Sequence, residues 1–263
     1  GTYAKYEKSA SYDQPGVDSG SFTIHDLAET SRFGWESYDN FEEGTLDPEN
    51  WETGYFSGGQ EPKFISDNFS WPPLNILELK GDSYTGSNAR KIPAGSFWEE
   101  VNAASQSAGD SNTAIFIQDE EIIGVQAKIR LNDYTYSENG YSEQFSNQAG
   151  VYIAAPPSQL SIELVWREYQ DLQDEWGDPT NRIWGDTYFS YYEEAILYDP
   201  TNGTRVAHRN QWYTVSLVRL DGKISYFIDG NKISEFTASD DLPLQWMIGA
   251  FNDNGEAFSA YVD

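Results

Sequence analysis

The chain has 263 residues, with 16 lysines and arginines against 43 aspartates and glutamates, so its formal net charge at pH 7 is −27. A field of that sign repels phosphate backbones and anionic lipid headgroups, which argues against nucleic acid as a partner. The chain has no cysteine and no apolar run approaching ~18 residues, so we expect neither a disulfide framework nor insertion into a membrane.

Aromatic residues make up 16% of the chain, while hydrophobic residues overall reach only 38%. Some of these rings are therefore expected to face solvent or a ligand. The acidic surplus has two interpretations: a solvated surface that keeps an extracellular protein soluble, or carboxylates that in part bind Ca²⁺. A first residue of Gly1 in place of Met fits a processed or trimmed product.

Two segments are predicted. Residues 1–35 are rich in Ser, Gly, Asp, Tyr and Lys and have no sustained hydrophobic period. They form either an N-terminal arm, laid over the domain or toward a neighbour, or a disordered leader. Residues 36–263 form a single large all-β domain, a common size for one sandwich.

Short β-prone runs separated by polar turns follow along the domain, and helix is expected only as one short piece at 96–104. The acidic, aromatic segment 169–184 is interpreted as a functional loop, because long loops in compact domains usually bind or cover a ligand. A terminal hairpin is expected over 248–262. Strands are expected at 74–80, 114–117, 122–131, 149–155, 160–166 and 186–197.

The clearest local signal lies at 211–236. Three β-prone runs alternate there with Asp221-Gly222 and Asp229-Gly230. Asp-Gly between alternating runs is the strongest short-range hairpin signal, since it accepts positive φ at low cost. This stretch predicts three antiparallel strands.

This meander resembles a segment of concanavalin A-like jelly rolls, which include laminin G-like domains, legume-type lectins and sugar hydrolases. Asp39, Phe41 and Gly44, followed by Leu46, Asp47 and Trp51, also resemble the opening of such modules, D-x-F-(D/E)-G-x-L-D-x-x-W, with one extra Glu before the glycine and one extra residue before the tryptophan. The resemblance implies an all-β, two-sheet antiparallel jelly-roll sandwich.

Two carboxylates are the candidate catalytic residues. Retaining glycosidases need two carboxyl groups about 5 Å apart. The laminarinase-like hydrolases of this fold carry them on one strand as E-x-D-x-x-E, and Glu163 and Glu168 match the outer positions, whereas Val165 stands in place of the Asp. An offset of five residues puts the two side chains on opposite faces of a strand unless a bulge intervenes.

A binding site is easier to motivate from the aromatic residues. Sugar C–H faces stack on flat rings, while sugar hydroxyls need polar partners. Rings and polar side chains are concentrated within a short stretch, and some of the rings are alternatively core. The candidate ligand-binding residues are Trp166, Arg167, Tyr169, Trp176, Asn181, Trp184, Tyr188 and Tyr191.

The resemblance also implies a structural Ca²⁺ that joins the first and last strands. The matching positions are Glu42, Glu43, the carbonyl of Gly44, and Asp263. Carboxylate and carbonyl oxygens are the ligands that Ca²⁺ prefers. Solvated acidic side chains are the alternative interpretation.

Three functions remain open. The favoured hypothesis is a secreted, lectin-like carbohydrate-binding or adhesive module without catalysis, with a polysaccharide or glycan as its partner. The second is a divergent glycoside hydrolase or polysaccharide lyase of the same fold; such lyases resemble this chain only around Gln148 to Tyr152, and the only histidines are His25 and His208. The third is a subunit of an extracellular assembly, joined through the N-terminal arm and an open edge at Tyr261 to Asp263.

Overall fold

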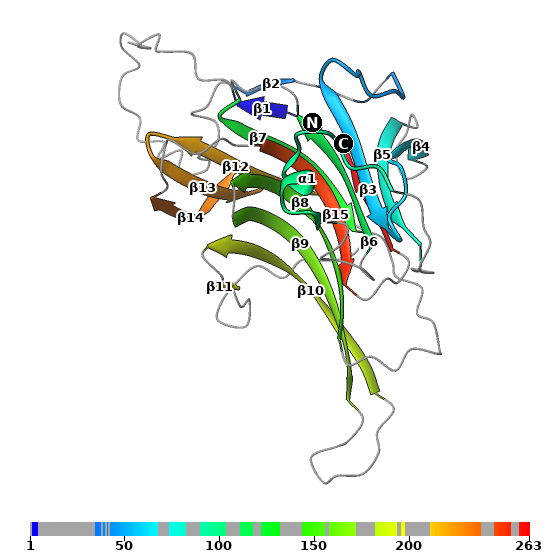
Figure 1. The fold of residues 1–263 in the computed structure, drawn as a ribbon. Coiled ribbons are helices and arrows are strands. Elements are labelled where there is room, and N and C mark those ends of the chain that lie inside the picture. The colour runs from blue at the N-terminus through cyan, green and yellow to red at the C-terminus, as the bar shows by residue number, and fades with distance from the viewer. Residues whose placement is uncertain are drawn as a thin grey trace.

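The structure is a computed structural model and consists of two antiparallel sheets, called here sheet A and sheet B (Figure 1). Buried apolar residues from both sheets form one cluster between them. The predicted all-β jelly-roll sandwich is therefore confirmed. The described residues are 2–4, 35–37, 39, 41, 43–67, 74–82, 90–103, 111–117, 122–131, 144–155, 158–171, 182–193, 196–197, 211–237, 245–253 and 258–263.

Sheet A has nine strands, seven of them in the order β14-β13-β12-β7-β16-β5-β4. β1 lies off this path and pairs with both β7 and β2. The strands are β1 (Thr2–Ala4), β2 (Trp35–Ser37), β4 (Lys63–Asp67), β5 (Leu74–Gly81), β7 (Gly124–Leu131), β12 (Tyr213–Leu220), β13 (Lys223–Ile228), β14 (Asn231–Thr237) and β16 (Phe258–Val262).

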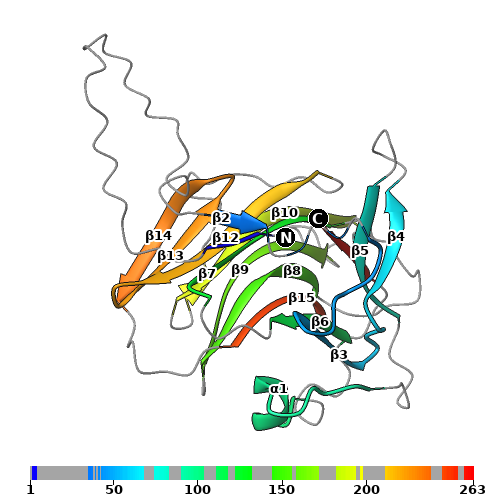
Figure 2. The ribbon, with the colours of Figure 1, turned by 90° about the horizontal axis from the view of Figure 1, so that it is seen from above.

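Sheet B has seven strands in the order β11-β10-β9-β8-β15-β6-β3, and they arch beside sheet A when seen from above (Figure 2). The short helix α1 (Phe97–Glu100) lies within the segment where helix was expected. No described helix has the length and apolar character needed to cross a membrane. The strands are β3 (Trp51–Ser57), β6 (Ser111–Ile117), β8 (Gln144–Ala155), β9 (Ser158–Asp171), β10 (Arg182–Glu193), β11 (Ile196–Leu197) and β15 (Gln245–Asp253).

The predicted meander is confirmed as β12, β13 and β14. Both connecting turns have positive φ at two successive residues, 52° and 71° at Asp221 and Gly222 and 48° and 76° at Asp229 and Gly230. Consecutive positive φ values are the signature of the tight turns that match strand twist. Local sequence chemistry is therefore sufficient to build this part of sheet A.

The expected terminal hairpin at 248–262 is wrong. β15 pairs with β6 and β8 in sheet B, whereas β16 pairs with β5 and β7 in sheet A. The chain thus crosses between sheets after Asp253. Alternating hydrophobicity identifies both strands but says nothing about their partners, which are distant in sequence.

The open edge expected at the C-terminal strand is also absent, because β16 has a partner on each side. The backbone amide of Asp263 donates a hydrogen bond to the carbonyl of Lys128 at 2.9 Å, and the amide of Lys128 donates one to the carbonyl of Asp263 at 3.3 Å. Thr2–Ala4, within the predicted arm, adds a strand beside β7 of the same chain. Residues 5–34 of the predicted arm lie outside the described residues.

A buried arginine joins several elements on the outer side of sheet A. The guanidinium of Arg130 lies 3.4 Å from the carboxylate of Asp67, and both side chains are at least 95% buried. It also lies 4.7 Å from the ring centroids of Trp212 and Tyr261. Burial raises the pKa of the Tyr261 phenol, and Glu78 adds to this effect. One cation therefore connects β7 with β4, β16 and the residue before β12.

Removing the Asp67 carboxylate leaves that buried cation without its anion. We expect Asp67→Ala to lower the free energy of unfolding by about 3–5 kcal/mol, measured by urea denaturation. Lys63→Ala is the control on the same strand: the Lys63–Glu78 pair spans 3.1 Å, but the lysine is 55% exposed. That change should cost at most about 1 kcal/mol. Equal effects of the two substitutions would contradict the structural role of Arg130.

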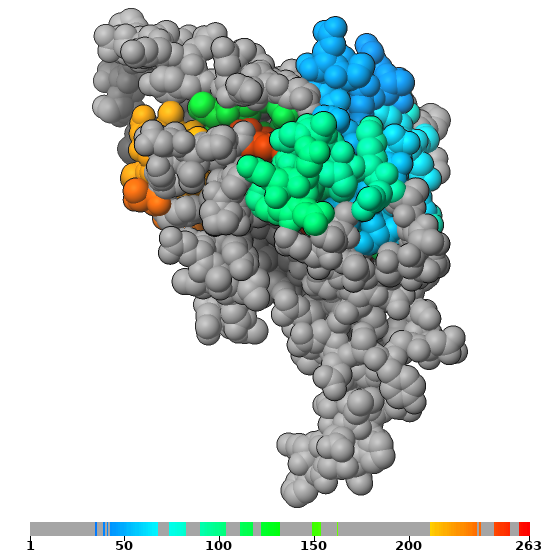
Figure 3. Space-filling view, in the orientation of Figure 1, coloured from blue at the N-terminus to red at the C-terminus, as the bar shows by residue number. Residues whose placement is uncertain are grey.

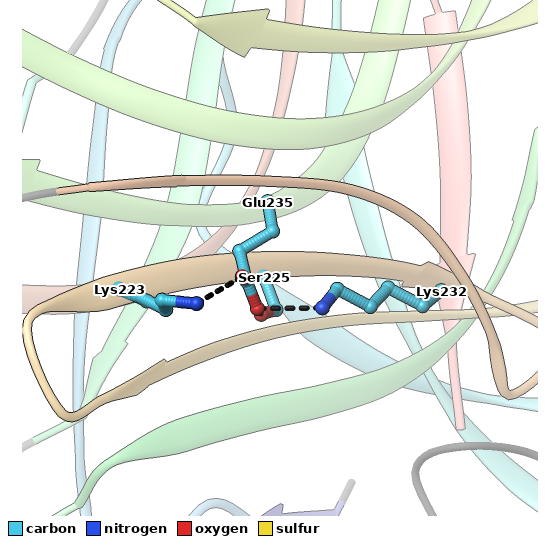
Figure 4. A network of polar contacts seen from close by, with 4 residues as sticks. All are labelled: Lys223, Ser225, Lys232 and Glu235. Carbon is cyan, nitrogen blue, oxygen red and sulfur yellow. Dashed lines mark hydrogen bonds and ion pairs between the residues drawn. The ribbon is translucent and has the colours of Figure 1, made fainter.

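A second polar network lies on β13 and β14 (Figure 4). The Glu235 carboxylate accepts hydrogen bonds from Lys223 Nζ at 2.7 Å, Lys232 Nζ at 2.5 Å and Ser225 Oγ at 3.0 Å. These donors, the Lys223 ammonium first, lower the pKa of Glu235 to about 2. All three donors favour the ionised carboxylate, so the network depends on that charge.

The lowered pKa of Glu235 predicts an acid-dependent contribution to stability. A carboxylate whose folded-state pKa lies below the unfolded value stabilises the fold above about pH 4.5 and loses this effect as pH falls toward 2. The melting temperature of Glu235→Gln should therefore fall below that of wild type at pH 6, and the two should converge as pH falls through about 2. Glu61→Gln, the same change at an exposed residue, should track wild type throughout. A constant gap for Glu235→Gln would refute the prediction.

Candidate functional site

Sheet B has two faces with different surroundings. Val151 of β8 and Ile162 of β9 are register partners, and both lie in the core shared with sheet A. Tyr152 and Ser161 form the next pair, and Tyr152 belongs to a second apolar cluster on the opposite face. Because strand residues alternate between faces, these two pairs show whether each position along β8, β9 and β10 is on the core face or on the opposite, outer face.

The register places the candidate residues of β9 on two different faces. Positions 163, 167 and 169 have the parity of Ser161, and therefore fall on the outer face, away from sheet A. Trp166 and Glu168 have the parity of Ile162, on the core face. Pairing runs without a register shift from Ile162 to Asp171. Glu163 and Glu168 therefore do not share a face, since no bulge occurs between them.

β10 extends the same outer face by one strand. Trp184 pairs with Tyr169, Asp186 with Arg167, and Tyr188 with Val165. Tyr191 pairs with Ile162 and has the core-face parity. The outer-face positions of β9 and β10 that carry an aromatic ring or a charge are called here the β9–β10 patch, which comprises Glu163, Arg167, Tyr169, Asp171, Arg182, Trp184, Asp186 and Tyr188.

The expected loop at 169–184 is shorter than predicted. β9 continues to Asp171 and β10 begins at Arg182, so Tyr169 and Trp184 are register partners in a sheet. The ends of β9 and β10 were not recognised as strands in the sequence because they are polar, and only one face of each strand belongs to the core. Trp176 and Asn181 lie outside the described residues.

The other half of the outer face, over β3, β6 and β15, is covered by residues 90–103, seen as a raised blue-green surface in Figure 3. Trp98 of this segment is 3% exposed. Its ring makes edge contacts with Phe56 and Phe116, with centroids 4.8 and 5.0 Å apart. A Cβ at Gly54 would lie 2.9 Å from the Trp98 ring, so glycine is needed for this packing.

Polar contacts fix this covering segment. Ser96 caps α1 by accepting a hydrogen bond from the Glu99 amide at 3.3 Å, and the Glu99 carboxylate accepts one from the Gly95 amide at 2.5 Å. The Phe97 amide donates to Gln245 Oε1 on β15 at 2.8 Å. The Ser-x-x-Glu spacing was a signal in the sequence for a helix start. It did not indicate that the helix covers half of a sheet.

The outer face of sheet B is therefore divided. Tyr152 lies at the boundary, with its ring centroid 4.9 Å from that of Phe251, which in turn contacts Trp98. Toward β3 the face is apolar and covered. Toward β10 it carries the β9–β10 patch, where aromatic positions alternate with charged ones.

The predicted calcium ligands are only partly described. Asp263 is 2.7 Å from Lys128 Nζ, so its charge has a protein partner, and Glu43 is exposed. The Asp39 carboxylate accepts hydrogen bonds from the Phe41 amide and from Trp51 Nε1. No group of three or more acidic, histidine or cysteine residues assembles within the described part of the chain. Glu42 lies outside it, and the calcium site stays a prediction.

No protein-family profile and no curated protein matches this chain. Among solved structures, it is similar to the marine PL7 alginate lyase AlyA1 from Zobellia galactanivorans, at 9% identity, covering 85% of this chain and 96% of that one with a TM-score of 0.48. It is also similar to a glycoside hydrolase family 16 endo-glucanase from Bacteroides ovatus, at 10% identity, with coverages of 84% and 95% and a TM-score of 0.42. At these sequence identities and TM-scores, the similarities do not assign a function to this chain.

The calcium prediction is tested by melting. If Glu42 or Glu43, the Gly44 carbonyl and Asp263 bind Ca²⁺, a hundredfold excess over Kd stabilises the native state by about 2.7 kcal/mol. We expect CaCl2 to raise the melting temperature by several degrees above NaCl at matched ionic strength, since screening alone also stabilises so acidic a protein.

Asp263→Asn and Lys128→Met separate the ion from the ion pair in this melt. The first substitution removes the carboxylate and should abolish the Ca²⁺ effect. The second breaks the same ion pair but keeps the carboxylate, so the effect should persist. An unchanged Ca²⁺ shift in Asp263→Asn, or none in wild type, would exclude the site.

Proposed function

We propose that this protein is a secreted carbohydrate-binding protein that holds a polysaccharide on the β9–β10 patch without cleaving it. The observation that carries the proposal is the register of β9 and β10, which brings the aromatic positions 169, 184 and 188 to one face together with Arg167 and Asp186. Rings for sugar C–H faces beside groups for sugar hydroxyls are the chemistry that glycan binding requires.

The positions of the carboxylates support the proposal that the protein does not cleave the polysaccharide. A double-displacement mechanism needs an acid and a nucleophile about 5 Å apart on the same side of the sugar. Glu163 falls on the outer face and Glu168 on the core face, with Val165 between them where the hydrolase motif has an Asp. A single outer-face glutamate in this strand does not supply the pair.

Pull-down and calorimetry with neutral and acidic polysaccharides test the binding. We expect at least one polysaccharide to bind, and Tyr169→Ala or Trp184→Ala to weaken it about tenfold, equivalent to ~1.4 kcal/mol. Trp212→Ala is the control, because it removes a ring that lies outside the β9–β10 patch, next to Arg130 of sheet A. Each variant is first compared with wild type by circular dichroism. Retained affinity in both patch variants, or no binding to any polysaccharide, would contradict the proposal.

A lyase or hydrolase is the second candidate, and one observation favours it. Gln148, Glu163 and Arg167 have the same outer-face parity as the buried Tyr152, so residue types that can hold a carboxylate or move a proton occupy positions on one face. Release of reducing ends or of unsaturated products distinguishes this from binding alone. Product that disappears in Glu163→Gln or Tyr152→Phe would establish the enzyme.

Self-assembly is measured in the same samples. β1 already pairs with β7 of its own chain, and β16 has partners on both sides, so these strands leave no vacant position for a neighbour. Size-exclusion chromatography with and without residues 1–35 tests the assembly hypothesis. An oligomer that dissociates on removal of this segment would support it.

A further inference from the structure

The charges of sheet B bear on which polysaccharide the proposed site accepts. Across its seven strands the basic residues are Arg167 and Arg182 alone. The acidic residues of these strands are Glu52, Glu163, Glu168, Asp171, Asp186, Glu193 and Asp253. The sheet itself is thus strongly acidic, in a protein whose formal net charge is −27.

Each of the two arginines lies opposite an acid in the register. Arg167 pairs with Asp186, and Arg182 pairs with Asp171. On the other side, Arg167 pairs with Ser146, whose own partner on β15 is Asp253. Both cationic positions on the outer face therefore have anionic neighbours within the sheet, and neither adds a net positive charge to the patch.

Several described basic residues of sheet A form ion pairs with acids. Lys128 lies 2.7 Å from Asp263, Lys63 lies 3.1 Å from Glu78, and Lys223 and Lys232 both contact Glu235. These pairs leave little positive charge to offset the overall field. An anionic polymer carries a charge on each sugar, so it needs a series of unpaired cations along its path.

We infer that the β9–β10 patch selects an uncharged polysaccharide and rejects uronate or sulfated chains. This rests on the proposed function and adds the ligand class. The aromatic positions 169, 184 and 188 provide stacking surface that does not depend on charge, whereas Asp186 and Asp171 oppose any carboxylate brought near the two arginines. Specificity then arises from repulsion as much as from attraction.

The test uses one neutral polysaccharide that binds, and the same polymer oxidised at C6 to carry carboxylates. We expect the oxidised polymer to bind at least tenfold more weakly at 50 mM NaCl, and the difference to shrink at 500 mM NaCl because salt screens the repulsion. Affinity for the neutral polymer should be nearly independent of salt. All measurements are made in EDTA and repeated in CaCl2, to expose bridging by divalent ions.

Charge variants give a second readout. Asp186→Asn and Asp171→Asn remove the negative charges at the register positions opposite Arg167 and Arg182, so the double variant should bind the oxidised polymer about tenfold better than wild type. Glu61→Gln and Glu49→Gln together make the same change in net charge at exposed residues outside sheet B, and should have little effect. An equal gain in both pairs would mean that only the overall charge matters, and would overturn the role of the patch.

The outcomes separate the two proposals. If only acidic polysaccharides bind, with affinity that falls as salt rises, the protein is a glycan-binding protein and the inference about ligand charge is wrong. If no polysaccharide of either kind binds, the proposed function fails and the inference falls with it. Binding of the neutral polymer alone, with the expected gain in the double variant, supports both.

Discussion

Each strand of sheet B gives every second residue to the core that it shares with sheet A. That constraint follows from the alternation of side chains along a strand, and it decides which residues remain for function. Ile162 and Val151 are completely buried on the core face, so the opposite parity is the one that a ligand can meet. Along each strand of sheet B, core-face positions therefore alternate with positions that face away from sheet A.

The outer face is then divided a second time, across the strands. Trp98 and its aromatic neighbours extend the hydrophobic core beyond sheet B and cover β3, β6 and β15. Such clusters bury a large apolar area, and edge contacts between rings add to the stabilisation. Because this cluster covers β3, β6 and β15, polar and aromatic positions are found together only on the part of the outer face formed by β8, β9 and β10.

Much of the fold was accessible from the sequence, because its signals are local. The Asp-Gly turns at 221 and 229 define the meander through the φ values that they tolerate. The partners of β15 and β16 were not accessible, since each pairs with strands far away in the chain. For the site, composition identified Tyr169, Trp184 and Tyr188 as candidates. Only the register separated them from Trp166, Glu168 and Tyr191, which have core-face parity.

The place of β16 in sheet A has a consequence for how the protein is made. This strand lies between β5 and β7, although it comes near the end of the sequence while they come in its first half. During synthesis the β4–β5 pair and the β7–β12–β13–β14 group can form, but they stay separate until residues 258–263 leave the ribosome. Completion of the sheet must therefore wait for translation of β16, far downstream of β5 and β7, a non-local step of the kind that slows folding. Until then the facing edges of β5 and β7 have no partner along the positions that β16 later occupies, and the strongly negative charge of the chain opposes pairing of those edges with other copies.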